Sequence, residues 1–328
     1  MRQIIAEIGS VHDGSFGNAC RLIDAAAACG ADTVKFQTHI AEAESLPDAP
    51  APSYFTAEPR LEYFRRTAFS VEQWGALKRR CADAGVVFLS SPFSLEAVDL
   101  LEEVGVDTYK VPSGEVSNTP LLERIALTGK PVLLSSGMSD WAELDRAVST
   151  LGVGGPVTVM QCTSLYPCTP EKVGLNVILE MGKRYGLPVG FSDHTLGSAA
   201  AFAAAALGAT VIEKHFTFSR RMYGSDAANA MEPGEFRAFA EGLRAIWQMR
   251  AHPVDKNDVS DFAEMRHVFQ KSVVAARNLP AGHVLAFEDL AFKKPGDGIP
   301  SGAYAELLGR KLARSIEKNQ KLQLQDLA

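Results

Sequence analysis

The chain has 328 residues, which is too long for one small core and suits a barrel of roughly 250 residues followed by a small extra domain. Hydrophobic residues make up 46% of it and charged residues 22%, so the composition excludes a disordered or fibrous protein. The formal net charge of -6 argues against nucleic acid or an anionic membrane as a partner, since both repel a negatively charged protein.

The cysteines and the N-terminal residues indicate where the protein works. Five cysteines are too few for a disulfide framework in a chain of this length, and no two of them have the CxxC spacing of a structural zinc site. The first residues turn polar too early for the apolar region of a signal peptide. The Ala-rich stretch 199–207 is far shorter than the roughly 20 residues that span a bilayer. We therefore expect a cytoplasmic protein with reduced thiols.

Up to about residue 250, short apolar runs rich in β-branched residues alternate with helical stretches, which is typical of βα units. We expect strands at residues 4–8, 33–36, 86–89, 108–111, 132–134, 157–161, 189–191 and 210–212. We expect helices at residues 19–29, 71–84, 95–104, 121–127, 141–151, 199–207 and 233–249. Eight such units favour a closed parallel (β/α)8 TIM barrel over residues 1–255 rather than an open sheet.

Two stretches interrupt this alternation. Residues 39–67 form a long insertion after the second strand, where barrel loops are usually functional, and are a candidate lid. Residues 256–270 are polar and indicate a linker. Residues 271–328 contain short strand-like runs and a Lys-Pro-Gly-Asp-Gly turn at 294–298, so we expect a small β-rich domain. A core this small is marginal alone and should dock on the barrel or on a partner subunit.

Barrel enzymes carry their reactive side chains at the carboxyl ends of the strands and in the loops that follow. Nearly every expected strand of this chain ends in a polar group, and chance explains such a series poorly. The residues are Glu7, Lys35, Gln37, Ser91, Lys110, Ser113, Glu115, Ser135, Ser164, Tyr166, Ser192, Asp193, His194, Glu213 and His215.

Two of the histidines end neighbouring strands, His194 the seventh and His215 the eighth, so we expect them a few ångströms apart at one rim. Neutral imidazoles in this position can share one divalent cation, with water or substrate oxygens as its other ligands. Ordinary core or surface histidines are the alternative. No role is assigned to the histidines of loops and tail, which are His39, His252, His267 and His283.

Lys35 and Lys110 end the second and fourth strands, from which they can face each other across the barrel mouth. Beside the rim serines, two ammonium groups would hold a phosphate or a carboxylate. The alternative is Schiff-base chemistry, in which burial and a second cation lower the pKa of a lysine. No sequence feature separates these two uses.

Several stretches around these residues carry a resemblance to a known family. They are Ala-Glu-Ile-Gly-Ser-Val-His-Asp-Gly at 6–14, Gly-Ala-Asp-Thr-Val-Lys-Phe-Gln-Thr at 30–38, Ser-Ser-Pro-Phe at 90–93, Tyr-Lys-Val-Pro-Ser-Gly-Glu at 109–115, Gly-Lys-Pro-Val-Leu-Leu-Ser-Ser-Gly-Met at 129–138, Gln-Cys-Thr-Ser-Leu-Tyr-Pro at 161–167, Phe-Ser-Asp-His-Thr-Leu-Gly at 191–197 and Ile-Glu-Lys-His-Phe-Thr at 212–217. In them the chain resembles the sialic acid (N-acetylneuraminate) synthase family, NeuB type. Its end, with Lys-Lys-Pro-Gly-Asp-Gly-Ile at 293–299, resembles the antifreeze-like (SAF) domain of that family.

The resemblance implies that phosphoenolpyruvate condenses with an amino-sugar aldehyde of the N-acyl mannosamine type, giving a sialic-acid-like nonulosonic acid and phosphate by C–O cleavage. It implies a divalent metal, Mn²⁺, Mg²⁺ or Co²⁺, on His194 and His215, and catalysis by these histidines and Glu7. The implied phosphoenolpyruvate contacts are Lys35, Ser91, Lys110, Ser113, Ser135, Ser164 and Ser192. The implied sugar contacts are Gln37, Glu115, Tyr166, Asp226 and Lys294.

The resemblance also implies a domain-swapped homodimer, in which the C-terminal domain of one chain covers the barrel of the other. Three positions depart from the family pattern. Val11 stands where Asn usually precedes His12, and Ser164 stands where relatives often have Asn. Lys294 replaces an arginine that is often donated across the dimer to the acyl group of the sugar. Because lysine cannot make the planar bidentate contact of arginine, we expect that group to be held differently.

Two other functions stay open at this point. One is a lysine Schiff-base aldolase that uses free pyruvate, and the other is a non-catalytic carbohydrate-binding protein. Sugar binding alone does not explain why two lysines, two histidines and Glu7 gather at one rim.

Overall fold

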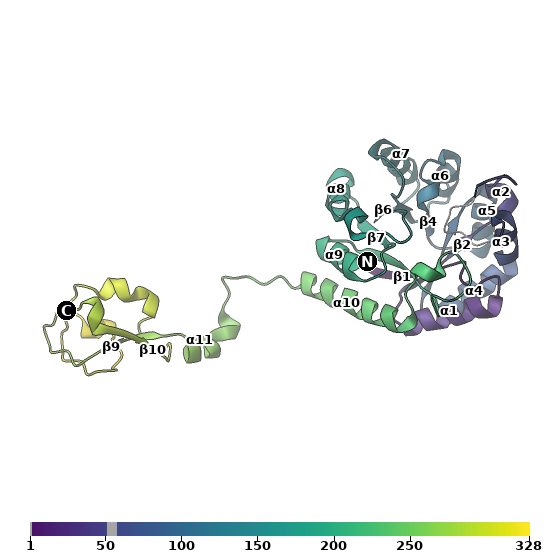
Figure 1. Ribbon diagram of the computed structural model, residues 1–328. Coiled ribbons are helices and arrows are strands. Elements are labelled where there is room, and N and C mark those ends of the chain that lie inside the picture. The colour runs from purple at the N-terminus through teal and green to yellow at the C-terminus, as the bar shows by residue number, and fades with distance from the viewer. Residues whose placement is uncertain (1, 51–57) are drawn as a thin grey trace. The chain divides into compact units, whose positions relative to one another are not determined.

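The computed structural model describes residues 2–50 and 58–328 and divides the chain into two compact units, Met1–His252 and Pro253–Ala328. In the first unit, eight parallel strands close into a barrel in sequential order, and helices surround it (Figure 1). The expected TIM barrel is thereby confirmed. The domain boundaries expected at residues 255 and 271 stay predictions.

The strands are β1 Gln3–Gly9, β2 Thr33–Thr38, β3 Val87–Pro92, β4 Tyr109–Val111, β5 Val132–Ser135, β6 Val157–Cys162, β7 Val189–Asp193 and β8 Val211–His215. Each strand lies where the sequence predicts one. Most of the strands run one to three residues further at the carboxyl end than predicted. The apolar pattern stops before the strand does, because polar residues such as Ser91, Ser135 and Ser192 occupy most of the added positions.

The inside of the barrel is layered. Five buried apolar side chains from five different strands form a cluster of their own. Successive side chains of a strand point to opposite faces, so the residue two positions further on faces the same interior. The pairs of cluster and rim residues are Ile5 and Glu7, Leu89 and Ser91, Leu133 and Ser135, Met160 and Cys162, and Val211 and Glu213. A polar layer therefore lies directly on an apolar floor.

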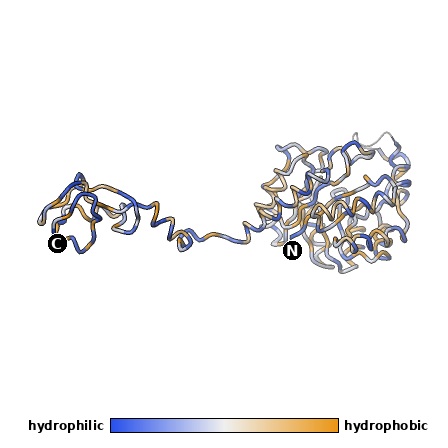
Figure 2. Tube along the Cα trace, turned by 90° about the horizontal axis from the view of Figure 1, so that it is seen from below, coloured by the Kyte–Doolittle hydropathy of each residue, from blue (hydrophilic) through white to orange (hydrophobic). Residues whose placement is uncertain are grey.

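The outer helices are α1 Phe16–Ala28, α4 Val71–Asp83, α5 Leu95–Val104, α6 Thr119–Ala126, α7 Trp141–Gly152, α8 Leu175–Tyr185, α9 Ala199–Leu207 and α10 Pro233–Ala251. Most of them carry both apolar and polar positions along their length (Figure 2), and their apolar residues join the main core between helices and strands. Capping boxes at Ser70 and Asp140 define the starts of α4 and α7. Among the described residues, no helix has the length and apolar character needed to cross a bilayer.

The insertion after β2 contains the short helices α2 Ala41–Glu44 and α3 Arg60–Thr67. Residues 51–57 of the candidate lid lie outside the described residues. The side chains of Tyr63 and Phe64 in α3 are buried, and Phe64 stacks on the ring of His39. The described part of the insertion thus packs at the mouth of the barrel, and its action as a lid stays a prediction.

The second unit has a small core of its own. Strands β9 Ser272–Ala275 and β10 Leu290–Lys293 pair antiparallel, and isolated bridges add the other sheet contacts that the structure describes in this unit. The core residues are Val273, Ala275, Leu279, Leu285, Leu290, Leu307, Leu312, Ile316 and Leu322. The predicted small C-terminal domain is present, with more turns than strands. Helix α11 Ala263–Phe269 precedes it.

Candidate active site

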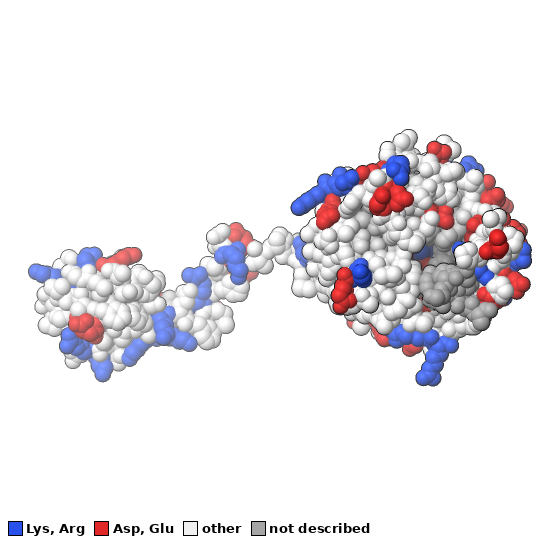
Figure 3. Space-filling model, turned by 45° about the horizontal axis from the view of Figure 1, so that its top comes forward, with Lys and Arg blue, Asp and Glu red and all other residues white. Residues whose placement is uncertain are grey.

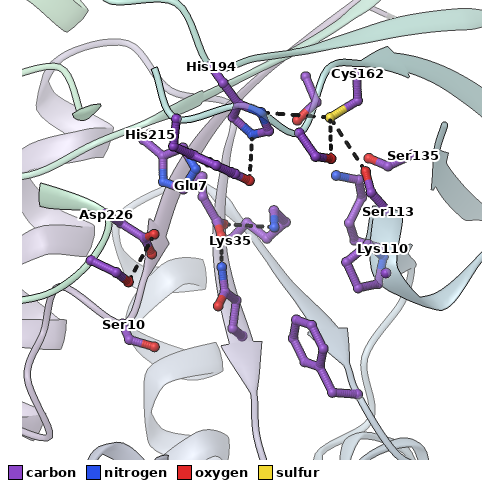
Figure 4. A pocket seen from close by; sticks show the side chains of 18 of the residues that line it. Glu7, Ser10, Lys35, Lys110, Ser113, Ser135, Cys162, His194, His215 and Asp226 are labelled. Carbon is purple, nitrogen blue, oxygen red and sulfur yellow. Dashed lines mark hydrogen bonds and ion pairs between the residues drawn. The ribbon is translucent and has the colours of Figure 1, made fainter. Parts of the chain in front are cut away.

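A cavity of about 300 Å³ opens at the carboxyl ends of the strands. Many of the residues predicted for the site line it together, as Figure 4 shows in part. They are Glu7, Lys35, Gln37, Lys110, Ser113, Ser135, Ser164, Tyr166, Ser192, His194, His215 and Asp226. On the face of the barrel unit that Figure 3 shows, acidic and basic side chains are interspersed, so binding of an anion depends on this cavity rather than on a charged surface.

Three of the residues implied as substrate contacts lie apart from the cavity lining. Ser91 is fully buried, where its hydroxyl accepts a hydrogen bond from Lys35 Nζ at 3.4 Å. Glu115 follows β4 and accepts a hydrogen bond from the Asn118 amide at 2.7 Å. Lys294 belongs to the second unit, where its Nζ lies 4.7 Å from the centre of the Phe269 ring.

Both site lysines are engaged with buried carboxylates. Lys110 Nζ lies 2.8 Å from Glu213 Oε2, and Lys35 Nζ lies 3.5 Å from Glu213 Oε1 and 2.9 Å from Glu7 Oε2. Ser192 donates a hydrogen bond to Glu213 Oε1 at 3.1 Å. The lysines therefore meet at Glu213, one of the polar strand-end residues expected from the sequence. With all four groups ionised, this cluster is neutral.

The pKa values of the two carboxylates diverge. Burial alone would raise the pKa of Glu213, but Lys110 and Lys35 more than offset burial and lower it to about 2. Burial raises the pKa of Glu7, and the attraction of Lys35 offsets only part of that rise. Glu7 is thus the carboxyl group of the cluster that takes up a proton more readily. A protonated Glu7 would leave the cluster with one net positive charge, which favours an anionic ligand.

A group of hydroxyls beside the lysines has the form of an anion cradle. The side-chain oxygen of Ser135 is buried and has no hydrogen-bond partner among the described residues. A Cβ atom on Gly137 would overlap the hydroxyls of Ser113 and Ser164, so glycine keeps these two groups open to the cavity. A buried hydroxyl without a partner is destabilising unless a ligand satisfies it.

The two rim histidines are neighbours, with ring centres 5.5 Å apart. His194 Nδ1 donates to the Thr163 carbonyl at 2.9 Å, so His194 Nε2 carries the lone pair, which accepts from the Tyr166 hydroxyl at 3.2 Å. Burial lowers the pKa of His215 to about 4, which keeps this imidazole neutral at neutral pH. Its buried Nδ1 has no hydrogen-bond partner among the described residues.

These histidines fit a divalent cation that keeps several open positions. Among the residues that the structure describes, no group of three or more His, Cys, Asp or Glu side chains could hold a metal ion. The two imidazoles would therefore be the protein ligands of the cation, and water or substrate oxygens would fill its remaining positions. Burial would lower the pKa of His194, but Cys162 and the Thr163 carbonyl raise it, so a cation at Nε2 would compete with protonation of that nitrogen.

A buried ion pair stands directly beside the histidines in both strands. Asp193 Oδ2 lies 2.8 Å from Lys214 Nζ, and both side chains are 0% exposed. The two residues are register partners of β7 and β8. Lys214 also donates to the carbonyls of Thr195 and Gly197, and Asp193 accepts from the Thr195 amide. The pair thereby fixes the loop after His194 to the strand that ends in His215.

Among the lining residues that were not predicted for the site are Cys162, His39 and Arg60. Cys162 is the last residue of β6, so its place at a strand end was a usable signal. Its thiol lies 3.5 Å from Ser113 Oγ; burial would raise its pKa, but His194 outweighs burial and lowers it to about 7. His39 and Arg60 come from the insertion, where no periodic pattern indicates which side chains reach the mouth.

Comparisons with known proteins agree with the geometry. The model of the NeuB family matches residues 22–255, and the model of the SAF domain matches residues 270–328. The chain is 34% identical to the N,N'-diacetyllegionaminic acid synthase of Campylobacter jejuni, over 97% of this chain and 97% of that protein. It is also 34% identical to the N-acetylneuraminate-9-phosphate synthase of Homo sapiens, over 96% and 90% of the two chains.

A solved structure shares the same fold. The N-acetylneuraminic acid synthetase of Leptospira borgpetersenii serovar Hardjo-bovis, crystallised with citrate, superposes with a TM-score of 0.72 at 30% identity, over 80% of this chain and 90% of that one. The resemblance noted in the sequence motifs is thereby confirmed. The chain belongs to the NeuB family, the nonulosonic acid synthases, and carries a SAF domain at its C-terminal end.

Proposed function

We propose that this synthase condenses phosphoenolpyruvate with an N-acyl mannosamine-type sugar aldehyde to give a nonulosonic acid and phosphate. The observation that carries the proposal is the arrangement of one cavity, in which an anion cradle and a histidine pair lie on either side of Glu7 (Figure 4). The relatives from Campylobacter jejuni and Homo sapiens, named as synthases of such acids, support it.

The anionic substrate occupies the lysine and serine side of the cavity in this proposal. Lys35, Lys110 and the unpartnered Ser135 hydroxyl hold its phosphate and carboxylate oxygens. The other proposed contacts are Ser91, Ser113, Ser164 and Ser192. These donors stay in place as C3 of phosphoenolpyruvate attacks the aldehyde carbon, and they stabilise the phosphoryl charge when the C2–O bond breaks.

The sugar aldehyde occupies the histidine side. A divalent cation, Mn²⁺, Mg²⁺ or Co²⁺, held by His194 and His215 would polarise the aldehyde oxygen as a Lewis acid. Glu7 lies between both substrates, where it stabilises positive charge at C2 and accepts a proton from the water that adds there. The proposed sugar contacts are Gln37, Glu115, Tyr166, Asp226 and Lys294.

A Schiff-base aldolase is the less favoured candidate. Burial would lower the pKa of Lys35, but Glu213 and Glu7 outweigh burial and raise it, so the amine is held in its protonated form. A Schiff-base lysine needs the unprotonated amine. Borohydride in the presence of pyruvate should therefore leave the protein unlabelled, and covalent trapping on Lys35 or Lys110 would favour the aldolase.

We propose that the enzyme works in the cytoplasm. All five cysteines lie within the described residues and are free thiols. Free thiols are usual in reducing compartments, where disulfides rarely persist.

If the site recognises the acyl group of the sugar, acetamido sugars should have higher kcat/KM values than sugars that lack this group. Polar groups built to pair with a hydroxyl or an acetamido group are left unpaired by an analogue that lacks it, and this can lower kcat/KM by several orders of magnitude. With phosphoenolpyruvate and Mn²⁺, at least one of N-acetylmannosamine and a 2,4-diacetamido-6-deoxy sugar should exceed unacylated mannose by about 100-fold in a phosphate-release assay. Rapid turnover of mannose or arabinose 5-phosphate, with neither acetamido sugar accepted, would refute the assignment.

We also propose a domain-swapped homodimer. Helix α11 and the turn before it expose Phe262, Met265, Val268 and Phe269. Apolar side chains gathered on so short a segment favour burial against a second copy. Light scattering should show a dimer, and a chain ending near Asp261 should be monomeric with much lower activity. A truncated barrel that is both monomeric and fully active would contradict this proposal.

A further inference from the structure

Four side chains, Glu44, His39, Gln37 and Glu7, form a hydrogen-bonded series from the insertion to the polar layer of the barrel. Gln37 Nε2 donates to Glu7 Oε1 at 2.7 Å. The amide oxygen of Gln37 lies 3.1 Å from His39 Nε2, and His39 Nδ1 lies 2.8 Å from Glu44 Oε2. The side chains of His39 and Glu44 are 5% and 4% exposed, so little water competes for these bonds.

The order of donors and acceptors along this series follows from the chemistry of the amide. Gln37 has a donor end and an acceptor end. Its NH₂ group faces the Glu7 carboxylate, so its oxygen faces His39, and His39 Nε2 must carry a hydrogen. With Glu7 ionised, the alternative orientation of Gln37 would bring two acceptor oxygens together at 2.7 Å.

The same reasoning extends to Glu44. Because His39 Nε2 is a donor, the bond between His39 Nδ1 and Glu44 needs a further proton, held either by the ring or by the carboxyl group. In both cases His39 presents a donor to Gln37. A Glu44 carboxylate stabilises a ring that is protonated on both nitrogens, and a Glu44 carboxyl group donates to Nδ1, so both forms are compatible with the observed orientation of the amide.

Packing keeps the His39 ring from turning. It is stacked between Phe64 of α3 and Phe93, with ring centres 3.8 Å and 4.2 Å away and interplanar angles of 15° and 19°. The other oxygen of Glu44 lies 4.0 Å from an Arg60 nitrogen. Rotation of the ring out of its plane would break both stacks and both hydrogen bonds at once.

We infer that His39 and Glu44 are positioning residues, which hold the Gln37 amide nitrogen against Glu7. The inference rests on the proposed function, in which Gln37 meets the sugar and Glu7 lies beside the reacting carbons. With Oε1 occupied by Gln37, Oε2 of Glu7 stays directed at Lys35, 2.9 Å away. The insertion thus contributes to the geometry of the reaction in addition to packing at the mouth.

Kinetics of matched variants test the inference. His39→Phe keeps an aromatic ring between Phe64 and Phe93 and removes both hydrogen bonds. We expect kcat/KM for the sugar to fall about 30-fold or more, with a higher sugar KM and a lower kcat, while the phosphoenolpyruvate KM changes less than about twofold. Glu44→Gln can still donate to His39 Nδ1 and should stay within about threefold of the parent.

A control variant lies on the same helix. Glu42 is exposed and pairs with Arg65, so Glu42→Gln should leave the kinetics unchanged. In a Gln37→Ala background, His39→Phe should change kcat/KM less than about twofold, because His39 acts through Gln37. An equal loss in both backgrounds would show that His39 acts by another route and would overturn the inference.

Crystal structures of the variants give a readout that does not depend on turnover. The Gln37 nitrogen should stay within hydrogen-bond distance of Glu7 Oε1 in Glu44→Gln and leave it in His39→Phe. If the amide stays in place in His39→Phe, the inference is wrong, whatever the activity. If the amide moves as expected but no acetamido sugar is turned over by the parent enzyme, the inference holds and the proposed function fails.

Discussion

Replacing His215 by alanine is expected to lower the Mn²⁺-supported kcat/KM by about 1,000-fold or more while leaving the barrel folded. His215 and His194 are the neighbouring pair proposed to hold the cation, and His194 alone would bind a divalent cation weakly. Loss of the Lewis acid removes several kcal/mol of stabilisation from the transition state, and about 4 kcal/mol corresponds to 1,000-fold. Phosphate release measures the rate, and electron paramagnetic resonance of Mn²⁺ measures binding independently of turnover.

His252→Ala is the matched control, since His252 is exposed beyond the end of α10. It should retain the Mn²⁺ affinity and rate of the parent. Chelation by EDTA should abolish activity in the parent, and added Mn²⁺ should restore it. An EDTA-treated enzyme with full activity, or unchanged Mn²⁺ binding in His215→Ala, would exclude the proposed metal site.

Lys214→Met is expected to lower the free energy of unfolding by about 3–5 kcal/mol, because it leaves Asp193 buried without its cation. The carbonyls of Thr195 and Gly197 also lose a donor. Equilibrium unfolding in urea measures the change. Such a loss is a large part of the stability of an ordinary domain, so reduced yield of folded protein is expected as well.

Two further variants test whether the loss of stability in Lys214→Met comes from the broken ion pair or from the loss of a lysine in general. Lys183→Met removes an exposed lysine at the end of α8 and should change stability by less than about 0.5 kcal/mol. The double variant Asp193→Leu with Lys214→Met should be more stable than Lys214→Met alone, because no charge is left without a partner. If Lys214→Met unfolds at the same urea concentration as the parent, the ion pair makes no such contribution.

The barrel could be predicted from the sequence because strand and helix periodicities differ and each apolar run marks a strand. The polar residues that follow each apolar run could be recognised in turn, and they led to most of the predicted residues that line the cavity. The pairing of Lys110 with Glu213 could not, since a sequence shows a charged residue but not its partner across the barrel. The role of His39 could not be predicted for a similar reason, because the position of its ring depends on how the insertion packs against Phe93.

The layering inside the barrel makes this protein far more sensitive to a shift in strand position than to substitution. Ile5 and Glu7 share one face of β1, with Ala6 on the other. Deleting a single residue between Ile5 and Glu7 would turn the carboxylate outward among the helices and bring an apolar side chain to the mouth. Substitutions at the rim leave the floor untouched. New chemistry can therefore arise on this barrel by point mutation, whereas single-residue insertions or deletions within its strands destroy site and core together.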